Sequence, residues 1–227
     1  MIEHPLPVLD AATRERFETA LYGLMAYREL TAFERLSSDA RFSPTLADRD
    51  ALARLAVEEF RHYELVRERI AAAGRDPQAA MEPFVASIDA LHERTRPGDW
   101  FESLMKAYVI DSVSGDFYQA IALALDEEAR VLVSEVQSMD AQTLWLLERL
   151  RDALGEDPRL GSRLALWGRR LLGEALTQAR RIGDRHAFWD NLIPMPPGPE
   201  RDARVAKLFA RLVENHSRRM GALGLTA

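Results

Sequence analysis

Apolar residues recur at intervals of three and four along most of this 227-residue chain, and no run alternates between apolar and polar residues. The first spacing places apolar side chains on one face of an α-helix, whereas alternation would indicate a β-strand. The sequence therefore predicts an all-α fold. The expected long helices cover about residues 11–36, 43–73, 99–125, 126–154, 158–183 and 200–223, with a short helix at about 85–94.

Several residue types mark where these helices begin and end. Ser43-Pro44 is a usual pair for a helix N-cap followed by a first-turn proline, and Gly74 closes the same helix. The acids of Asp126-Glu127-Glu128 suit the start of the fourth long helix. We expect that helix to run without interruption to Gly155.

The lengths of the connections predict how the helices are arranged. Short loops join the first helix to the second and the third to the fourth, but about two dozen residues separate the second from the third. Two antiparallel hairpins linked by one long crossover are typical of the ferritin-like four-helix bundle. We expect residues 1–227 to form a single ferritin-like domain, with a core bundle at about 11–155 and a C-terminal helical extension at about 158–223.

Two polar residues interrupt the apolar stripe of the second helix. Glu59 and His62 lie between Leu55 and Val66 at the spacing of a buried bundle seam. A carboxylate and an imidazole in such a seam need each other, another polar partner or a metal. Glu-x-x-His is the ligand pair of carboxylate-bridged di-iron bundles. The alternatives are a solvated pair, or a neutral core histidine bonded to a neighbouring glutamate.

A ferritin-like di-metal site also takes one carboxylate from the first helix and one from the third. Glu29 lies on an apolar stripe of the first helix, 30 residues before Glu59, so that the two can meet across a hairpin; Glu34 is its competitor. The third helix offers Asp111 and Asp116. A weak internal repeat between the two helices favours Asp111 as the ligand, which makes Asp116 a polar partner.

The fourth helix lacks the second ligand pair. Met139 and Gln142 occupy the seam positions where Glu-x-x-His is expected. A thioether and a neutral amide are poor ligands for iron or manganese. Glu135 and Asp140 are the nearby acids that could substitute. The site could therefore hold two ions, one ion, or none, with a protonated His62 paired to glutamates in the last case.

Short stretches across nearly the whole chain carry a resemblance to a known family. They are Ala26-Tyr27-Arg28-Glu29-Leu30, Pro44-Thr45-Leu46-Ala47-Asp48, Glu59-Phe60-Arg61-His62, Met81-Glu82-Pro83-Phe84, Lys106-Ala107-Tyr108, Asp116-Phe117-Tyr118, Leu166-Trp167-Gly168-Arg169-Arg170 and Arg218-Arg219-Met220. The chain resembles ferritin-like proteins related to the tRNA hydroxylase family, di-iron enzymes that hydroxylate an isopentenyl-adenosine in tRNA. It departs from them at Met139 and Gln142, where the relatives carry an acid and a histidine.

We therefore expect a ferritin-like metal-binding protein of the tRNA-hydroxylase-like group with a reduced carboxylate/His site. The expected ligands are Glu29, Glu59, His62 and Asp111, binding one or two iron ions, with manganese as a possible replacement. If active, the protein would be a monooxygenase-like oxidoreductase. One alternative is a metal-free structural or interaction protein on the same scaffold, with no cofactor.

A second alternative is a non-catalytic module that binds tRNA or other RNA. Residues 159–219 carry 13 Lys/Arg and 6 Asp/Glu, a local charge of +7 on a chain of net charge −6. Such a basic segment is typical of a nucleic-acid footprint, but also of solvated helix faces. RNA binding predicts an affinity that falls steeply with salt.

The amino-acid composition excludes several kinds of site and several classes of protein. The chain has no cysteine, which excludes disulfides and thiolate metal sites and fits a cytoplasmic location. The sequence has no run of about 20 apolar residues and no signal-peptide pattern at its start, so we expect no membrane span. Gly168 and Gly173 permit close helix approach on an apolar segment, which could pack on the bundle or on a second subunit, and we expect a homodimer. We expect His92 and His186 to be packing or capping residues, and His216 to have a structural or interfacial role.

Overall fold

The computed structural model describes residues 10–137, 140–186, 188–193 and 196–227, and only the backbone of residues 140–143 and 191. Throughout these residues the regular secondary structure is helical, which confirms the predicted all-α class. The elements are α1 (Ala11–Ala40), α2 (Leu46–Ala72), α3 (Pro77–Met81), the 3-10 helix η1 (Glu82–Phe84), α4 (Val85–Arg94), α5 (Trp100–Ala122), α6 (Glu127–Val136), α7 (Asp140–Glu156), α8 (Arg159–Arg185), α9 (Phe188–Leu192) and α10 (Pro199–Ala222).

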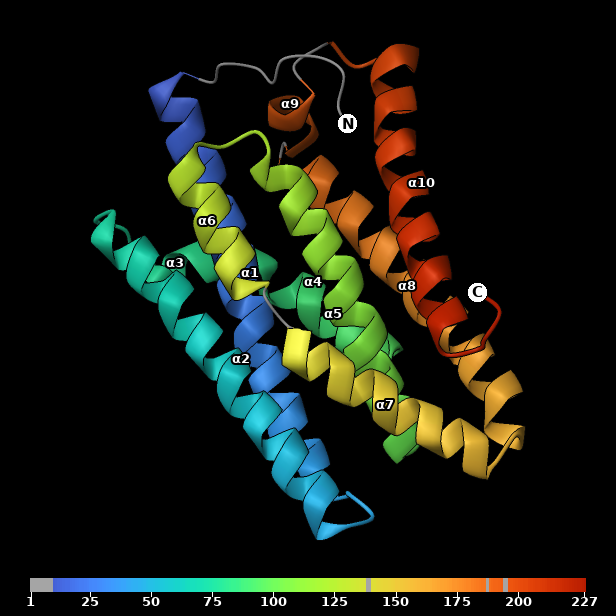
Figure 1. The fold of residues 1–227 in the computed structure, drawn as a ribbon. Coiled ribbons are helices and arrows are strands. Elements are labelled where there is room, and N and C mark those ends of the chain that lie inside the picture. Colours follow the sequence, from blue (N-terminus) through green and yellow to red (C-terminus); the bar gives the residue numbers. More distant parts are fainter. Residues whose placement is uncertain (1–9, 138–139, 187, 194–195) are drawn as a thin grey trace.

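The long helices pack side by side as a bundle (Figure 1). Helices α1 and α2 form a hairpin, and α5 packs along α8, with α10 against both α5 and α8. The predicted crossover between the second and third long helices is confirmed, and it contains α3, η1 and α4. This arrangement places the middle of the α1–α2 hairpin beside the middle of α5.

The start of α2 differs from the sequence prediction. Thr45, and not Ser43, is the N-cap residue, so Pro44 precedes the helix instead of lying in its first turn. The Thr45 hydroxyl accepts a hydrogen bond from the Asp48 backbone N–H at 3.0 Å and donates one to the Asp48 carboxylate at 2.8 Å. These two hydrogen bonds cap the N-terminus of α2 at Thr45, two residues after the predicted Ser43.

The prediction of one continuous fourth helix was wrong. Helix α6 ends at Val136, and α7 begins at Asp140 and turns away across α5 (Figure 1). Ser138 and Asp140 are residue types whose side chains compete with the backbone for hydrogen bonds, which weakens a helix. The break falls where the sequence predicted the second ligand pair; Met139 and the side chain of Gln142 lie outside the described residues.

Two clusters of buried apolar side chains form the core. Helix α1 contributes to the first cluster as far as Ala26 and to the second from Leu36 onward. Helix α2 contributes to the second cluster as far as Ala56 and to the first from Val66 onward. The intervals between these positions hold buried Arg28 and Glu29 on α1 and buried Glu59 and His62 on α2, close to buried Asp111 on α5. We call Arg28, Glu29, Glu59, His62 and Asp111 the polar layer.

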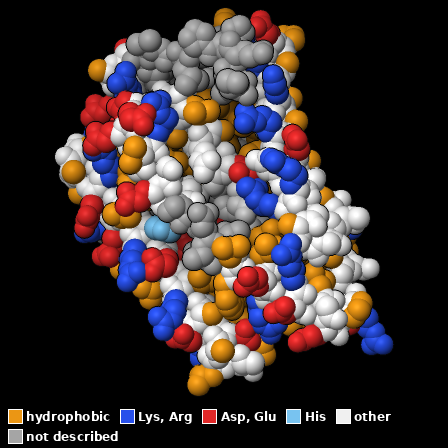
Figure 2. Space-filling view, viewed as in Figure 1, with side chains coloured by type: hydrophobic (Ala, Val, Ile, Leu, Met, Phe, Trp, Pro, Cys, Tyr) orange, Lys and Arg blue, Asp and Glu red, His pale blue; other side chains and the backbone are white. Residues whose placement is uncertain are grey.

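The surface carries charged side chains of both signs (Figure 2). Lys and Arg side chains follow the edge formed by α10, with acidic side chains between them. In the part of the chain that the structure describes, no helix is both long enough and apolar enough to cross a bilayer.

The contact between α1 and α3 gives a direct test of this packing. A Cβ atom added at Gly23 would lie 2.0 Å from the backbone carbonyl oxygen of Ala80. Because a backbone atom must move, we expect Gly23→Ala to lower the free energy of unfolding by about 2 kcal/mol or more. Chemical denaturation measures this value. Gly173→Ala is the control, since an added Cβ there meets nothing within 4 Å, and we expect it to stabilise by up to about 1 kcal/mol. Equal denaturation midpoints for Gly23→Ala and Gly173→Ala would contradict the packing of α3 on α1.

Candidate metal centre

Three acidic and imidazole side chains converge in the polar layer. Glu29 comes from α1, and Glu59 and His62 come from neighbouring turns of α2. Each offers one carboxylate oxygen or ring nitrogen, and these three atoms all lie within 4.8 Å of one another. Glu29 and Glu59 are fully buried, and His62 is 9% exposed. The hairpin register and the three-residue spacing on α2 thus bring together three of the four residues that the sequence indicated as ligands.

Oε2 of Glu29 and Nδ1 of His62 are buried without a hydrogen bond to any described residue. A buried polar atom that lacks a partner costs about 1–3 kcal/mol. Carboxylate oxygen and imidazole nitrogen are both ordinary ligands of divalent iron and manganese. The donor set therefore fits a metal ion that would satisfy both atoms.

Arg28 also belongs to this layer, although no role was predicted for it from the sequence. Its Nη1 lies 2.6 Å from Oε1 of Glu29, and its Nη2 lies 2.5 Å from Oδ1 of Asp111. All three residues are buried. The guanidinium therefore joins α1 to α5, and Asp111 lies with Arg28 outside the three-donor group. The one signal in the sequence was an arginine directly beside Glu29 in an otherwise apolar stretch of α1.

Gln137 reaches the layer from the end of α6. Its Nε2 lies 3.5 Å from Oε1 of Glu29. The absence of a side chain at Gly115 on α5 allows this approach, since a Cβ there would lie 2.8 Å from Oε1 of Gln137. A continuous fourth helix would have pointed other residues inward, so the sequence did not indicate Gln137. Glu135, one of the two acids predicted as substitute ligands, is exposed, although its charge acts to raise the pKa of His62. The side chain of Asp140, the other, lies outside the described residues.

Asp116 and Glu34, the other acidic residues considered as ligands, lie outside the three-donor group. Asp116 accepts hydrogen bonds from two guanidinium nitrogens of Arg219 at 2.7 and 2.8 Å and from Asn215 at 3.0 Å. It therefore ties α5 to α10, in line with a polar partner role. Glu34 is exposed on α1.

Burial changes the protonation of the group. Burial, with the charge and hydrogen bond of neighbouring Glu29, raises the pKa of Glu59 from 4.5 to about 8. Burial likewise raises the pKa of Asp111 from 3.8 to about 6, although Arg28 opposes it. Burial lowers the pKa of His62, against the attraction of Glu59. Without a metal, Glu59 therefore holds a proton near neutral pH while His62 is neutral.

The charge balance of the polar layer favours one divalent ion over two. With all three carboxylates ionised, His62 neutral and Arg28 charged, the layer has a net charge of −2. One divalent cation would neutralise it. A second would leave two buried positive charges without counterions, which is costly.

Comparison with known proteins places most of this chain in a family. A family model described as a ferritin-like domain of actinomycetes matches residues 12–195. The matched range includes every residue of the polar layer and the α6–α7 break. A search of curated proteins found no match.

Proposed function

Because the chain belongs to the family of ferritin-like domains found in actinomycetes, we propose that it is a metal-binding protein that holds one divalent ion through Glu29, Glu59 and His62. The observation that carries this proposal is the convergence of donor atoms from three buried residues, with Oε2 of Glu29 and Nδ1 of His62 lacking a hydrogen bond to any described residue. Oxygen and imidazole ligands suit iron or manganese. Such an ion would supply one-electron redox chemistry toward oxygen or peroxide.

The surrounding residues would position the ligands. Arg28 and Gln137 both contact Oε1 of Glu29, which leaves Oε2 for the ion. Glu59 would release its proton on binding, because the carboxylate and not the acid is the ligand. Apolar clusters of the core lie on either side of the layer.

Hydroxylation of a tRNA base, which the resemblance implies, draws on two ions in those relatives. Here we propose a single-ion site, because Arg28 already neutralises part of the carboxylate charge. Asp111 lies outside the three-donor group, so it would act as a fourth ligand only if its carboxylate moved toward the other three donors.

A metal-free scaffold protein is the second candidate, and Arg28 is the observation that favours it. A guanidinium paired with Glu29 and Asp111, and a proton held by Glu59, also compensate the buried charges. In that case, the polar layer would fix the register of α1, α2 and α5, and the protein would act through its surface.

RNA binding rests only on the basic charge of residues 159–219. Several arginines of that segment pair with acids of the same chain: Arg163 with Asp99 and Glu102, Arg201 with Asp190, Arg204 with Glu200, and Arg219 with Asp116. These contacts favour a structural role for those arginines. RNA binding remains a hypothesis without further support.

The homodimer also remains a prediction. Gly168 packs against the same chain, since a Cβ there would lie 2.7 Å from Cε of Met220 on α10. Gly173 has open space beside it, with nothing within 4 Å of an added Cβ. The close approach that Gly168 permits is therefore used by α10 and not by a second subunit.

The metal content of the purified protein tests the proposal. We expect one ion per chain, by elemental analysis, after expression with iron and manganese supplied. The double variant Glu59→Ala/His62→Ala should retain none, because it removes two of the three donors. Glu64→Ala, an exposed acid on the same helix, is the control and should bind like the parent. Two ions per chain would refute the single-ion site, and no ion in the parent would favour the metal-free scaffold.

A further inference from the structure

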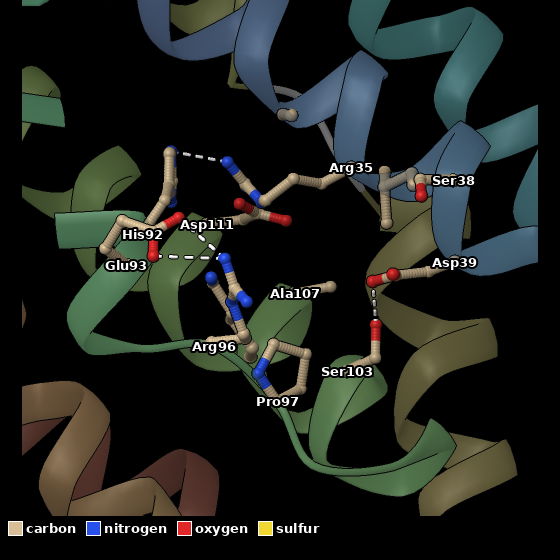
Figure 3. A pocket seen from close by; sticks show the side chains of 13 residues that line it. Arg35, Ser38, Asp39, His92, Glu93, Arg96, Pro97, Ser103, Ala107 and Asp111 are labelled. Carbon is tan, nitrogen blue, oxygen red and sulfur yellow. Dashed lines mark hydrogen bonds and ion pairs between the residues drawn. The ribbon is translucent and has the colours of Figure 1, made fainter. Parts of the chain in front are cut away.

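A polar cavity lies between α1, α4 and α5 (Figure 3). Its volume is about 330 Å³, at the lower end of the roughly 300–1,000 Å³ that small-molecule sites occupy. Asp111 lines this cavity, and its ion pair with Arg28 stands between the cavity and Glu29. Neither Glu29, Glu59 nor His62 lines it. The cavity is thus separate from the candidate metal centre.

Lys106 is the unusual residue of this cavity. The chain has 28 arginines and only two lysines, Lys106 and Lys207. Lys106 lines the cavity on α5 and is only 4% exposed. Among the described residues, it has no hydrogen bond and no carboxylate at ion-pair distance. Burial, with the charge of Arg35, lowers the pKa of Lys106 to about 7. The charges of Asp39, Asp111 and Glu93 in the same cavity act to raise this pKa, but none of these carboxylates forms an ion pair with the amine.

Arg35 is the second cation, and it faces the cavity from α1 (Figure 3). Its guanidinium donates a hydrogen bond to Nε2 of His92 on α4. Burial and the charges of Arg35 and Lys106 hold the pKa of His92 well below its usual range, so His92 is neutral. The imidazole accepts a hydrogen bond but contributes no negative charge. In the described part of the chain, no carboxylate forms an ion pair with Arg35.

The acids of the cavity wall are already engaged with other groups. Asp39 accepts a hydrogen bond from the Ser103 hydroxyl, and Glu93 pairs with Arg96 at 3.0 Å near the surface (Figure 3). The third, Asp111, is held by its ion pair with Arg28, which lies between the cavity and Glu29. The cavity therefore has two cations without a contacting anion.

We infer that this cavity binds a small molecule with a single carboxylate group, held between Lys106 and Arg35. A guanidinium and an ammonium both form strong charge-assisted hydrogen bonds to a carboxylate. A singly charged carboxylate suits the site better than a doubly charged phosphate, because the three wall carboxylates repel added negative charge. Ala32, Leu36 and Ala107 give part of the wall an apolar surface, which favours a short aliphatic chain.

Ligand-observed NMR with butyrate as the probe tests this inference on the full chain at about pH 6, where the Lys106 amine is protonated. We expect saturable binding by the parent protein. Lys106→Met should weaken it about tenfold or more, since it removes one charge-assisted contact. Lys207→Met is the matched control, because Lys207 is the other lysine and is exposed on α10; its affinity should equal that of the parent. Butanol, which has the same chain without the charge, should not bind.

Three results would overturn the inference. They are equal binding by Lys106→Met and the parent, equal binding of butanol and butyrate, and no butyrate binding at concentrations up to about 10 mM.

Lys106→Met should fold, because it replaces a buried charge by an apolar side chain of similar length. Circular dichroism checks that, and Arg35→Gln gives a second variant with the same expected loss. Binding should persist in Glu59→Ala/His62→Ala, which separates this site from the proposed metal centre.

Discussion

Replacing Arg28 by methionine is expected to destabilise the metal-free protein by about 3–5 kcal/mol near neutral pH. The guanidinium pairs with Glu29 at 2.6 Å and with Asp111 at 2.5 Å, and all three side chains are buried. Methionine has a similar length but no charge, so the two carboxylates would stay buried without their counterion. Urea denaturation with a chelator present measures the effect.

Two further variants test whether the destabilisation by Arg28→Met comes from the lost ion pairs. Arg28→Met/Asp111→Asn removes one orphaned charge together with the guanidinium, so it should be more stable than Arg28→Met alone. Arg61→Met is the control, because Arg61 pairs with Glu58 on the surface of α2 and should change stability by less than about 0.5 kcal/mol. A cost below about 1 kcal/mol for Arg28→Met would contradict the buried contacts.

The second large effect is a loss of stability with rising pH in the metal-free protein. Glu59 keeps its proton in the folded chain up to about pH 8, whereas the unfolded carboxyl releases it near its ordinary pKa of 4.5. Between these values the folded state binds a proton that the unfolded state has lost, so raising the pH favours unfolding. The slope approaches about 1.4 kcal/mol per pH unit within this window.

Glu59→Gln should remove most of this dependence, because glutamine is neutral at every pH. We expect the variant to be more stable than the parent at pH 8 by about 3 kcal/mol. A smaller slope should remain below about pH 6, where Asp111 titrates from its own raised pKa. Glu64→Gln, exposed on α2, should keep the pH dependence of the parent. Parallel pH curves for Glu59→Gln and the parent would show that Glu59 does not carry the effect.

Much of the fold followed from local sequence patterns. The period of apolar residues located the long helices, and the loop lengths predicted the α1–α2 hairpin and the crossover. The convergence of Glu29, Glu59 and His62 was predictable for the same reason. Two of these residues lie three apart on one helix, and the third lies across a short hairpin, so helix geometry and a single register suffice to bring them together.

The other features of the fold and of the candidate site depended on contacts between residues far apart in the sequence. Arg28 and Asp111 are 83 residues apart, and Gln137 reaches Glu29 from the end of α6, past Gly115 of α5. Periodicity describes which face of a helix is apolar, but it does not say where a helix will end against its neighbours or which partner a buried charge will take.

The sequence by itself thus determined the helical class, the hairpin and the identity of three candidate ligands. Only the tertiary structure decided the charge balance of the layer, through the Arg28 guanidinium, and formed the cavity around Lys106 and Arg35. The physical reason is that helix formation and apolar spacing are local properties. The compensation of a buried charge depends instead on whichever side chains the packing of α1, α4 and α5 brings to it.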